Sequence, residues 1–179
     1  CASAAQSGQL EVLQWAIANG CPFSRNRIIS IAARKGHLEV VKWLREQGCH
    51  WDQYTCSAAA SGGHLEVLNG QERTDVLGIT KLVQAAAANG HLEVLTWAIQ
   101  NGCEWIKGEF CSDAALHGHL EVLKWAREQG CSLNAPELCA RAAAGGHLEV
   151  LKWLREQGCP WDQKTCLAAA CNGRLEVLK

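Results

Sequence analysis

Residues 32–49 read AARKGHLEVVKWLREQGC, and close copies of this stretch recur along the chain. Its centre, Gly-x-Leu-Glu-Val, occurs seven times at intervals of 27 or 28 residues. The copies begin at Gly8, Gly36, Gly63, Gly90, Gly118, Gly146 and Gly173. A motif at a fixed short period is the signature of a tandem repeat, so we predict a stack of similar units instead of one globular core.

Each unit is predicted to hold two helices, which makes the fold class all-α. The first helix is short and rich in alanine, for example at about 165–172, and the second lies at about 148–157. The apolar residues of the second helix cover more than one stripe, so it needs neighbours on several sides. Gly158 follows it at a position that favours positive φ, and Asp52 and Asp162 are predicted N-caps of first helices. We therefore expect a solenoid of about seven helix-turn-helix units.

The run Ala32–Leu44, continued by Glu46, Gln47, Gly48 and Cys49, resembles an ankyrin repeat. The resemblance recurs seven times and covers nearly the whole chain. The unit is about six residues shorter than the family's unit of about 33. The missing residues fall after the Gly-Cys pair, where ankyrin repeats carry a projecting β-hairpin finger. The resemblance thus implies an ankyrin-like helical stack with reduced fingers that serves as a non-catalytic protein-recognition module.

We expect residues 1–179 to form one array, with its units centred on the repeat glycines. Cys1 aligns with Cys56, just inside a first helix, and Lys179 aligns with Lys42, inside a second helix. Both ends of the sequence therefore fall within a unit, and we expect the array to continue beyond them.

Composition and motifs exclude several functional classes. The chain has 17 Lys+Arg and 18 Asp+Glu, which give a net charge of −1. This argues against a protein dedicated to binding nucleic acid, which would carry an excess of basic residues. No apolar run approaches the roughly 18 residues of a membrane span, so we expect no membrane insertion. The sequence has no Gly-rich phosphate loop, nucleophile elbow or HExxH motif, so we expect neither an enzyme nor a cofactor.

Ten of the eleven cysteines occupy two repeated positions, thirteen residues after a repeat glycine and seven before it. Other units place Val76, Ile29 and Val83 there, which is typical of buried apolar positions. Buried thiols are therefore favoured, and disulfides or a metal site are the alternatives, although the Cys-x-x-Cys spacing of many zinc sites is absent. So many thiols favour a reducing intracellular compartment, the cytoplasm or nucleus. The two sets are Cys21, Cys49, Cys103, Cys131 and Cys159, and Cys1, Cys56, Cys111, Cys139 and Cys166.

Histidine and tryptophan also recur in register. A histidine directly follows five repeat glycines, and we interpret it as a structural hydrogen-bonding group, because a catalytic histidine would be unique. The tryptophan of the second helices is interpreted as core. A second aromatic series, Trp51, Trp105 and Trp161, is predicted to lie at the core edge, with exposed binding residues as the alternative. The histidines that follow repeat glycines are His37, His64, His91, His119 and His147. The tryptophans of the second helices are Trp15, Trp43, Trp97, Trp125 and Trp153.

Positions that differ between units are informative, because the framework of a repeat protein is what stays the same. On the first helices these variable positions lie six, five, two and one residues before the repeat glycine, opposite the alanine pair; the connecting loops vary as well. We expect this strip to face the concave side and bind a protein. The candidate residues are Arg25, Arg27, Arg34, His50, Tyr54, Lys107, Asp113, His117, Glu137 and Arg141. Drift on a solvated face is the alternative.

One unit departs from the pattern over residues 69–84. Gly70 stands where tryptophan is expected, and glycine costs a helix about 1 kcal/mol relative to alanine. A functional hinge, a decayed unit tolerated by its neighbours and an error in the sequence are the three interpretations left open.

The function predicted from these observations is a protein–protein interaction scaffold that carries no catalytic site. A structural subunit bound permanently in a large assembly is the alternative, and dissociable binding would distinguish the two. Metal binding by cysteine and histidine is a remote third possibility.

Overall fold

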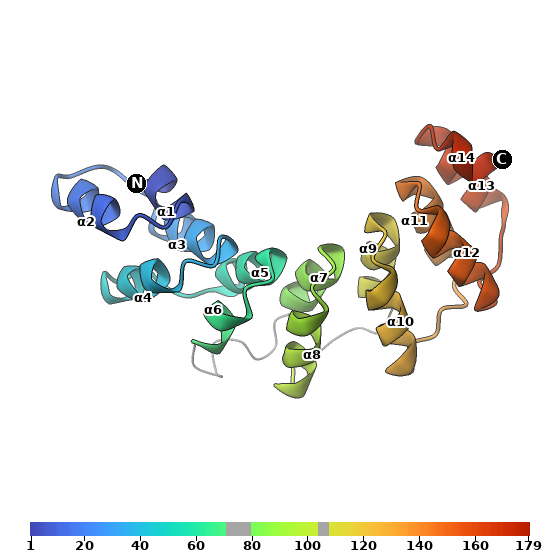
Figure 1. The fold of residues 1–179 in the computed structure, drawn as a ribbon, viewed down its shortest axis with the longest axis horizontal. Coiled ribbons are helices and arrows are strands. Elements are labelled where there is room, and N and C mark those ends of the chain that lie inside the picture. Colours follow the sequence, from blue (N-terminus) through green and yellow to red (C-terminus); the bar gives the residue numbers. More distant parts are fainter. Residues whose placement is uncertain (71–79, 104–107) are drawn as a thin grey trace. The chain divides into compact units, whose positions relative to one another are not determined.

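The computed structural model describes residues 1–70, 80–103 and 108–179, and all regular elements in these ranges are helices (Figure 1). The all-α prediction is confirmed. The helices are α1 (Ala2–Gln6), α2 (Leu10–Ala18), α3 (Arg25–Arg34), α4 (Leu38–Glu46), α5 (Gln53–Gly62), α6 (Leu65–Asn69), α7 (Thr80–Ala88), α8 (Leu92–Gln100), α9 (Glu109–His117), α10 (Leu120–Glu128), α11 (Pro136–Gly145), α12 (Leu148–Glu156), α13 (Gln163–Cys171) and α14 (Leu175–Leu178).

Odd-numbered elements are the alanine-rich first helices, and even-numbered elements are the second helices. Helix α12 matches its prediction to within one residue at its end, and α13 begins two residues before the predicted start. The earlier start follows from the cap, because the Asp162 carboxylate accepts a hydrogen bond from the Thr165 backbone N–H at 3.0 Å. Asp52 caps α5 in the same way, at 2.8 Å from the Thr55 N–H. Both predicted N-caps are confirmed.

The end of the second helix explains one of the two cysteine positions. After α12, Gly158 adopts φ +87°, as predicted. The Gly158 N–H donates to the Arg155 carbonyl at 3.0 Å, and the Cys159 N–H donates to the Leu154 carbonyl at 2.9 Å. This pair of bonds is a Schellman motif, in which the residue after the glycine packs against the last turn of the helix. Cys159 is accordingly buried.

The helices are grouped in two compact units. Unit 1 comprises residues 1–86 and 93–105, and unit 2 comprises residues 87–92 and 106–179. Within unit 1 the first helices α1, α3 and α5 are successive neighbours, and within unit 2 the same holds for α9, α11 and α13 (Figure 1). The paired alanines lie at these contacts; Ala32 and Ala33, for example, are fully buried. That residues 1–179 form one array stays a prediction.

The histidine that follows each repeat glycine joins neighbouring helix pairs. His37 Nε2 donates to the Gln6 carbonyl at 3.0 Å, and His147 Nε2 donates to the Leu116 carbonyl at 3.0 Å. Each carbonyl lies in the last turn or near the end of the preceding first helix, where helices leave carbonyls unpaired. In the last joint Arg174 takes the place of histidine and donates from Nε to a carbonyl at the equivalent place. The structural interpretation is confirmed for His37, His119 and His147.

The interpretation of the second-helix tryptophans as core is wrong for Trp15 and holds only in part for the other four. Trp15 is 69% exposed, and Trp43, Trp97, Trp125 and Trp153 are half-buried. In α4, α8, α10 and α12 the buried arc is formed by the valine, the following aliphatic residue and the residue after the tryptophan. In a helix the tryptophan is turned by about 100° from that last position, so it lies at the rim of the arc.

The second aromatic series is described at two positions, which differ in exposure. Trp51 is half-buried, and its indole N–H donates to the Cys56 sulfur at 2.7 Å. Trp161 is 37% exposed and makes the same bond to Cys166 at 3.2 Å. The core-edge prediction is thus confirmed for Trp51, whereas Trp161 is exposed, and Trp105 lies outside the described residues. The bond also gives the sulfur at the second cysteine position a polar partner.

Most of the irregular segment 69–84 lies outside the described residues. Its described start agrees with the helix-breaking role of glycine, because α6 ends at Asn69, directly before Gly70. The three interpretations of the segment are not distinguished. Among the described helices, none has the length and apolar character needed to cross a membrane.

Candidate functional site

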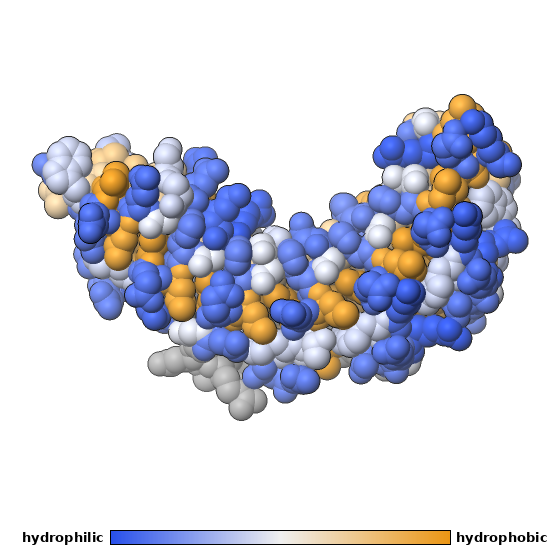
Figure 2. Space-filling view, in the orientation of Figure 1, coloured by the Kyte–Doolittle hydropathy of each residue, from blue (hydrophilic) through white to orange (hydrophobic). Residues whose placement is uncertain are grey.

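A groove between α3 and α5 of unit 1 brings together some of the predicted binding residues. The groove has a volume of about 380 Å³, and hydrophilic side chains cover this part of the unit (Figure 2). Three of the ten candidates, Arg27, Arg34 and Tyr54, line it together. The other lining residues are Ser30, Ile31, Ser57, Ala58 and Ser61. We call this site the α3–α5 groove.

The position nine residues before the repeat glycine forms an exposed row across the first helices. In unit 1 it holds Arg27 on α3, Tyr54 on α5 and Lys81 on α7. Tyr54 is 61% exposed, and the Lys81 ammonium lies 5.0 Å from the centre of its ring. A cation at this distance is attracted by the negative face of the ring, which holds both side chains at the edge of the groove.

Hydroxyl groups form part of the groove wall. The Ser30 hydroxyl lies 3.2 Å from the Thr55 hydroxyl, which in turn donates to the Asp52 cap at 3.0 Å. The Ser57 hydroxyl is buried and has no hydrogen-bond partner among the described residues. A buried hydroxyl without a partner lowers the stability of the folded protein.

Two other candidates of unit 1 lie apart from the groove. The Arg25 guanidinium donates to the Gln47 carbonyl at the end of α4, which ties this side chain to the framework. His50 is exposed in the connection between α4 and α5. Lys107 lies outside the described residues.

The four candidates in unit 2 are distributed over α9 and α11 and make local contacts. Arg141 forms an ion pair with Glu137 at 3.0 Å, four residues earlier on the same helix. His117 Nδ1 donates to the Asp113 carbonyl at 2.9 Å, and its ring stacks on that of His119. The Arg141, Glu137 and His117 side chains are therefore already engaged with neighbours of their own helix pair.

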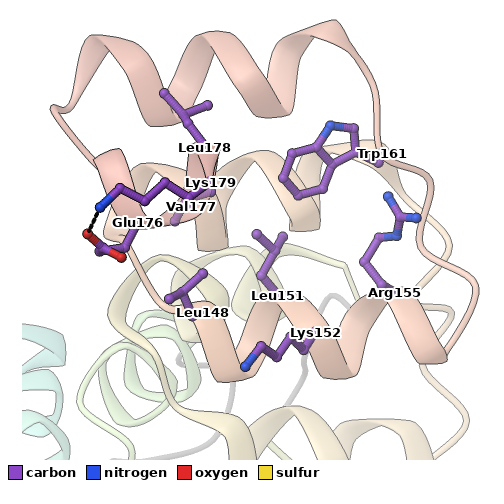
Figure 3. A pocket seen from close by; sticks show the side chains of 9 residues that line it. All are labelled: Leu148, Leu151, Lys152, Arg155, Trp161, Glu176, Val177, Leu178 and Lys179. Atoms are coloured by element: carbon purple, nitrogen blue, oxygen red, sulfur yellow. Dashed lines mark hydrogen bonds and ion pairs between the residues drawn. The ribbon is translucent and has the colours of Figure 1, made fainter.

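A second cavity, of about 550 Å³, lies in unit 2 between α12, Trp161 and α14. Figure 3 shows Leu148 and Leu151 of α12 on its lower side and Val177 and Leu178 of α14 above them. Leu148, Leu151 and Val177 occupy framework positions at which every unit carries an aliphatic residue. Residues that are common to all units cannot distinguish one partner from another, so the α3–α5 groove is the better candidate.

The cysteines have the properties of structural thiols. All eleven are free, seven are buried and only Cys171 is exposed. Burial raises the pKa of the Cys111 thiol to about 12, and burial together with the adjacent Cys159 thiol raises that of Cys139 to about 12. Thiols in this state stay protonated and are poor nucleophiles and metal ligands. Among the described residues no group of three or more histidine, cysteine or acidic side chains is placed to hold a metal ion.

Lys81 and the hydroxyl groups of the groove are not among the residues predicted from the sequence. The signal was available for Lys81, because the position nine residues before the glycine reads Arg, Tyr, Lys, Glu, Glu and Lys in successive units. For the serines the sequence contains no comparable signal, since small polar residues are common on any exposed helix.

Repeated helix pairs joined side by side define a helical repeat protein with a groove on its first helices. Family models for ankyrin repeats match residues 2–107 and 111–155. The chain belongs to the ankyrin repeat family. It is similar in fold to the crystal structure of the human ASB11 ankyrin repeat domain, with a TM-score of 0.64 and 21% identity over 90% of this chain and 84% of that one. No curated protein matches the sequence. Ankyrin repeats are generally protein–protein interaction modules, and the family is typically non-catalytic.

Proposed function

We propose that this chain is a non-catalytic interaction module that recognises a partner protein through the first helices and connecting loops, with the α3–α5 groove at its centre. The supporting observation is the division between buried repeated residues and exposed variable ones. The alanine pairs are buried where they are described, except in the last unit, whereas the row of Arg27, Tyr54 and Lys81 changes from unit to unit and is exposed. A surface that varies on a constant framework can acquire specificity without loss of stability.

Affinity capture from cells that express the protein tests this proposal. The wild-type chain is compared with a variant carrying Arg27→Ala, Arg34→Ala and Tyr54→Ala, and with a control carrying Lys42→Ala, Glu46→Ala and Lys152→Ala on the exposed second helices. We expect a protein that the wild type and the control retain and the groove variant loses, with all three equally folded by circular dichroism. Equal retention by the groove variant would contradict the proposal.

A permanently bound structural subunit is the second candidate function. Exchange of a captured partner against free unlabelled chain would favour the recognition module, and a partner that leaves only on unfolding would favour the structural subunit.

A further inference from the structure

We propose that the first-helix face of unit 1 binds an acidic segment of the partner protein, with carboxylates seated on Arg27 and Arg34 in the α3–α5 groove. This inference rests on the proposed function and specifies the chemistry of the partner.

The first argument is the charge of the face. Helices α1, α3, α5 and α7 together carry Arg25, Arg27, Arg34 and Lys81 and contain no aspartate or glutamate. The Asp52 carboxylate before α5 accepts cap hydrogen bonds from the Thr55 N–H and hydroxyl, which hold it at the helix start. The whole chain has a net charge of −1, so the positive charge of this face is local and is balanced by glutamates elsewhere.

The second argument is that the groove cations are available. Arg27 and Arg34 are exposed and form no ion pair with any described residue. The exposed lysines of the second helices differ in this respect; Lys42 and Lys124, for example, are paired with a glutamate three residues earlier. Guanidinium groups that are free of internal partners can form two-pronged hydrogen bonds with an incoming carboxylate.

The third argument is spacing. Arg27 and Arg34 are seven residues apart on one helix, which separates them by about 10 Å along the helix axis. Carboxylates three residues apart in an extended segment are separated by about 9–10 Å. A segment running along the groove with acidic residues at every third position would therefore reach both arginines. The exposed Tyr54 ring lies on the opposite wall, available to its intervening residues.

The corresponding face of unit 2 lacks this character. Helices α9, α11 and α13 carry Glu109, Asp113 and Glu137 against Arg141 and Lys164. A nucleic acid would also be attracted to cations, but the face of unit 1 offers a single exposed aromatic ring and few cations for a backbone that is charged at every nucleotide. The observations therefore favour an acidic protein segment.

Fluorescence anisotropy with a labelled peptide of Glu-Pro-Ser repeats tests the inference on the full chain. The Gln-Pro-Ser peptide has the same length and extended shape without the charge. We expect the glutamate peptide to bind, the glutamine peptide to bind about tenfold more weakly or not at all, and the affinity for the glutamate peptide to fall with rising salt.

Variants locate the binding site. Arg27→Glu with Arg34→Glu should weaken binding by about tenfold or more, and Arg27→Gln with Arg34→Gln should weaken it less. The control Lys42→Glu with Lys124→Glu changes the net charge by the same amount on the second helices and should leave binding within about twofold. Circular dichroism and urea unfolding verify that each variant is folded. If the double glutamate variant does not fold, the double glutamine variant is used for the comparison.

Several results would overturn the inference. They are equal affinity for the glutamine peptide, equal weakening by the control pair, and displacement of the glutamate peptide by single-stranded RNA at a lower concentration than by unlabelled peptide. The proposed function is tested separately by affinity capture. A captured protein that depends on the groove residues, together with no binding of the acidic peptide, would leave the proposed function standing and remove only the acidic segment.

Discussion

The repeat glycines meet two separate requirements at the joints between helix pairs. Gly118 has φ +82°, a conformation that side chains other than glycine rarely adopt. A Cβ at this position would also lie 2.5 Å from the ring of His147. Gly130 has a similar φ of +79°, yet a Cβ there would meet no atom within 4 Å. The protein thus contains a matched pair of glycines that separates backbone strain from contact with the next helix pair.

We expect Gly130→Ala to lower the free energy of unfolding by about 1–2 kcal/mol, the cost of the left-handed conformation. Gly118→Ala should lower it by a further 1–3 kcal/mol or so, because the histidine ring must move. Urea unfolding measures both values. In a His147→Ala background the alanine at position 118 no longer meets the ring, so Gly118→Ala should then lower the free energy of unfolding only as much as Gly130→Ala does. A double-mutant cycle of Gly118→Ala and His147→Ala measures this coupling. Identical losses for the two glycines would show that the histidine contact is unimportant.

The buried thiols predict a dependence of stability on alkaline pH. An unfolded cysteine ionises from about pH 9.0, whereas Cys111 and Cys139 have a folded-state pKa of about 12. The folded state therefore holds more protons between these values, and stability falls as pH rises above 9.0. Each thiol contributes at most about 1.4 kcal/mol per pH unit to this fall.

Replacing Cys111 and Cys139 by valine should reduce this fall, because valine does not ionise and Val83 occupies the equivalent buried position. Urea unfolding at pH 8 and at successive higher pH values, up to about 11, measures the difference. Cys171→Val is the control, because Cys171 is exposed and its replacement should leave the pH dependence unchanged. A double valine variant that loses stability as steeply as the wild type would contradict the assignment.

At the scale of the helix, the N-cap of α5 links local structure to the groove. The Asp52 carboxylate accepts from both the N–H and the hydroxyl of Thr55, which is fully buried. Asp52→Ala should destabilise the protein by about 0.5–2 kcal/mol and accelerate hydrogen exchange at the first turn of α5. Asp52→Asn, which retains a side-chain acceptor, should lose only a fraction of this. Gln53→Ala, one residue further on and exposed, should change neither measurement.

The helices were largely predictable from the sequence, because each depends on local signals. The glycine after α12 and the aspartate before α13 determine where the chain stops and starts being helical, and both predictions hold. The misplaced tryptophans show the limit of this reasoning. Periodicity identified an apolar arc, but the centre of that arc depends on where the neighbouring helices lie, and Trp15 falls outside it.

The groove was predictable only in part, for the same reason. Variation between units identified Arg27, Arg34 and Tyr54, which the structure brings together. The contact of Lys81 with Tyr54 depends on how far one helix pair is displaced from the next. That displacement arises from packing between units and is encoded in no single unit.

On the scale of the molecule, the contact between a repeat glycine and the next histidine is the same in successive helix pairs. We therefore predict that one whole repeat can be removed. Deletion of residues 119–146 joins Gly118 directly to His147 and removes one period of 28 residues. In the shortened chain each repeat glycine of unit 2 is still followed by a histidine, except Gly173, which is followed by Arg174. We expect it to fold with unchanged helicity per residue and a lower free energy of unfolding, because nearest-neighbour contacts are lost with one unit.

Circular dichroism and urea unfolding of the shortened chain test this expectation. Deletion of residues 119–132, which removes half a period and α10, is the control, because it connects first helices α9 and α11 without a second helix between them. This chain should lose helicity and cooperative unfolding. Similar behaviour of the two deletions would mean that the repeat period has no bearing on folding.

The joint formed by a glycine and the next histidine has a consequence for the gene that encodes it. Because Gly8 with His37 and Gly118 with His147 are the same joint, unequal recombination between two copies of the repeat yields a coding sequence whose junction is already compatible. The number of units can then change between generations in whole steps, without a compensating mutation. Since the residues nine positions before each glycine are carried along with their units, such an exchange also reorders the row that contains Arg27, Tyr54 and Lys81, and new binding surfaces arise from old parts.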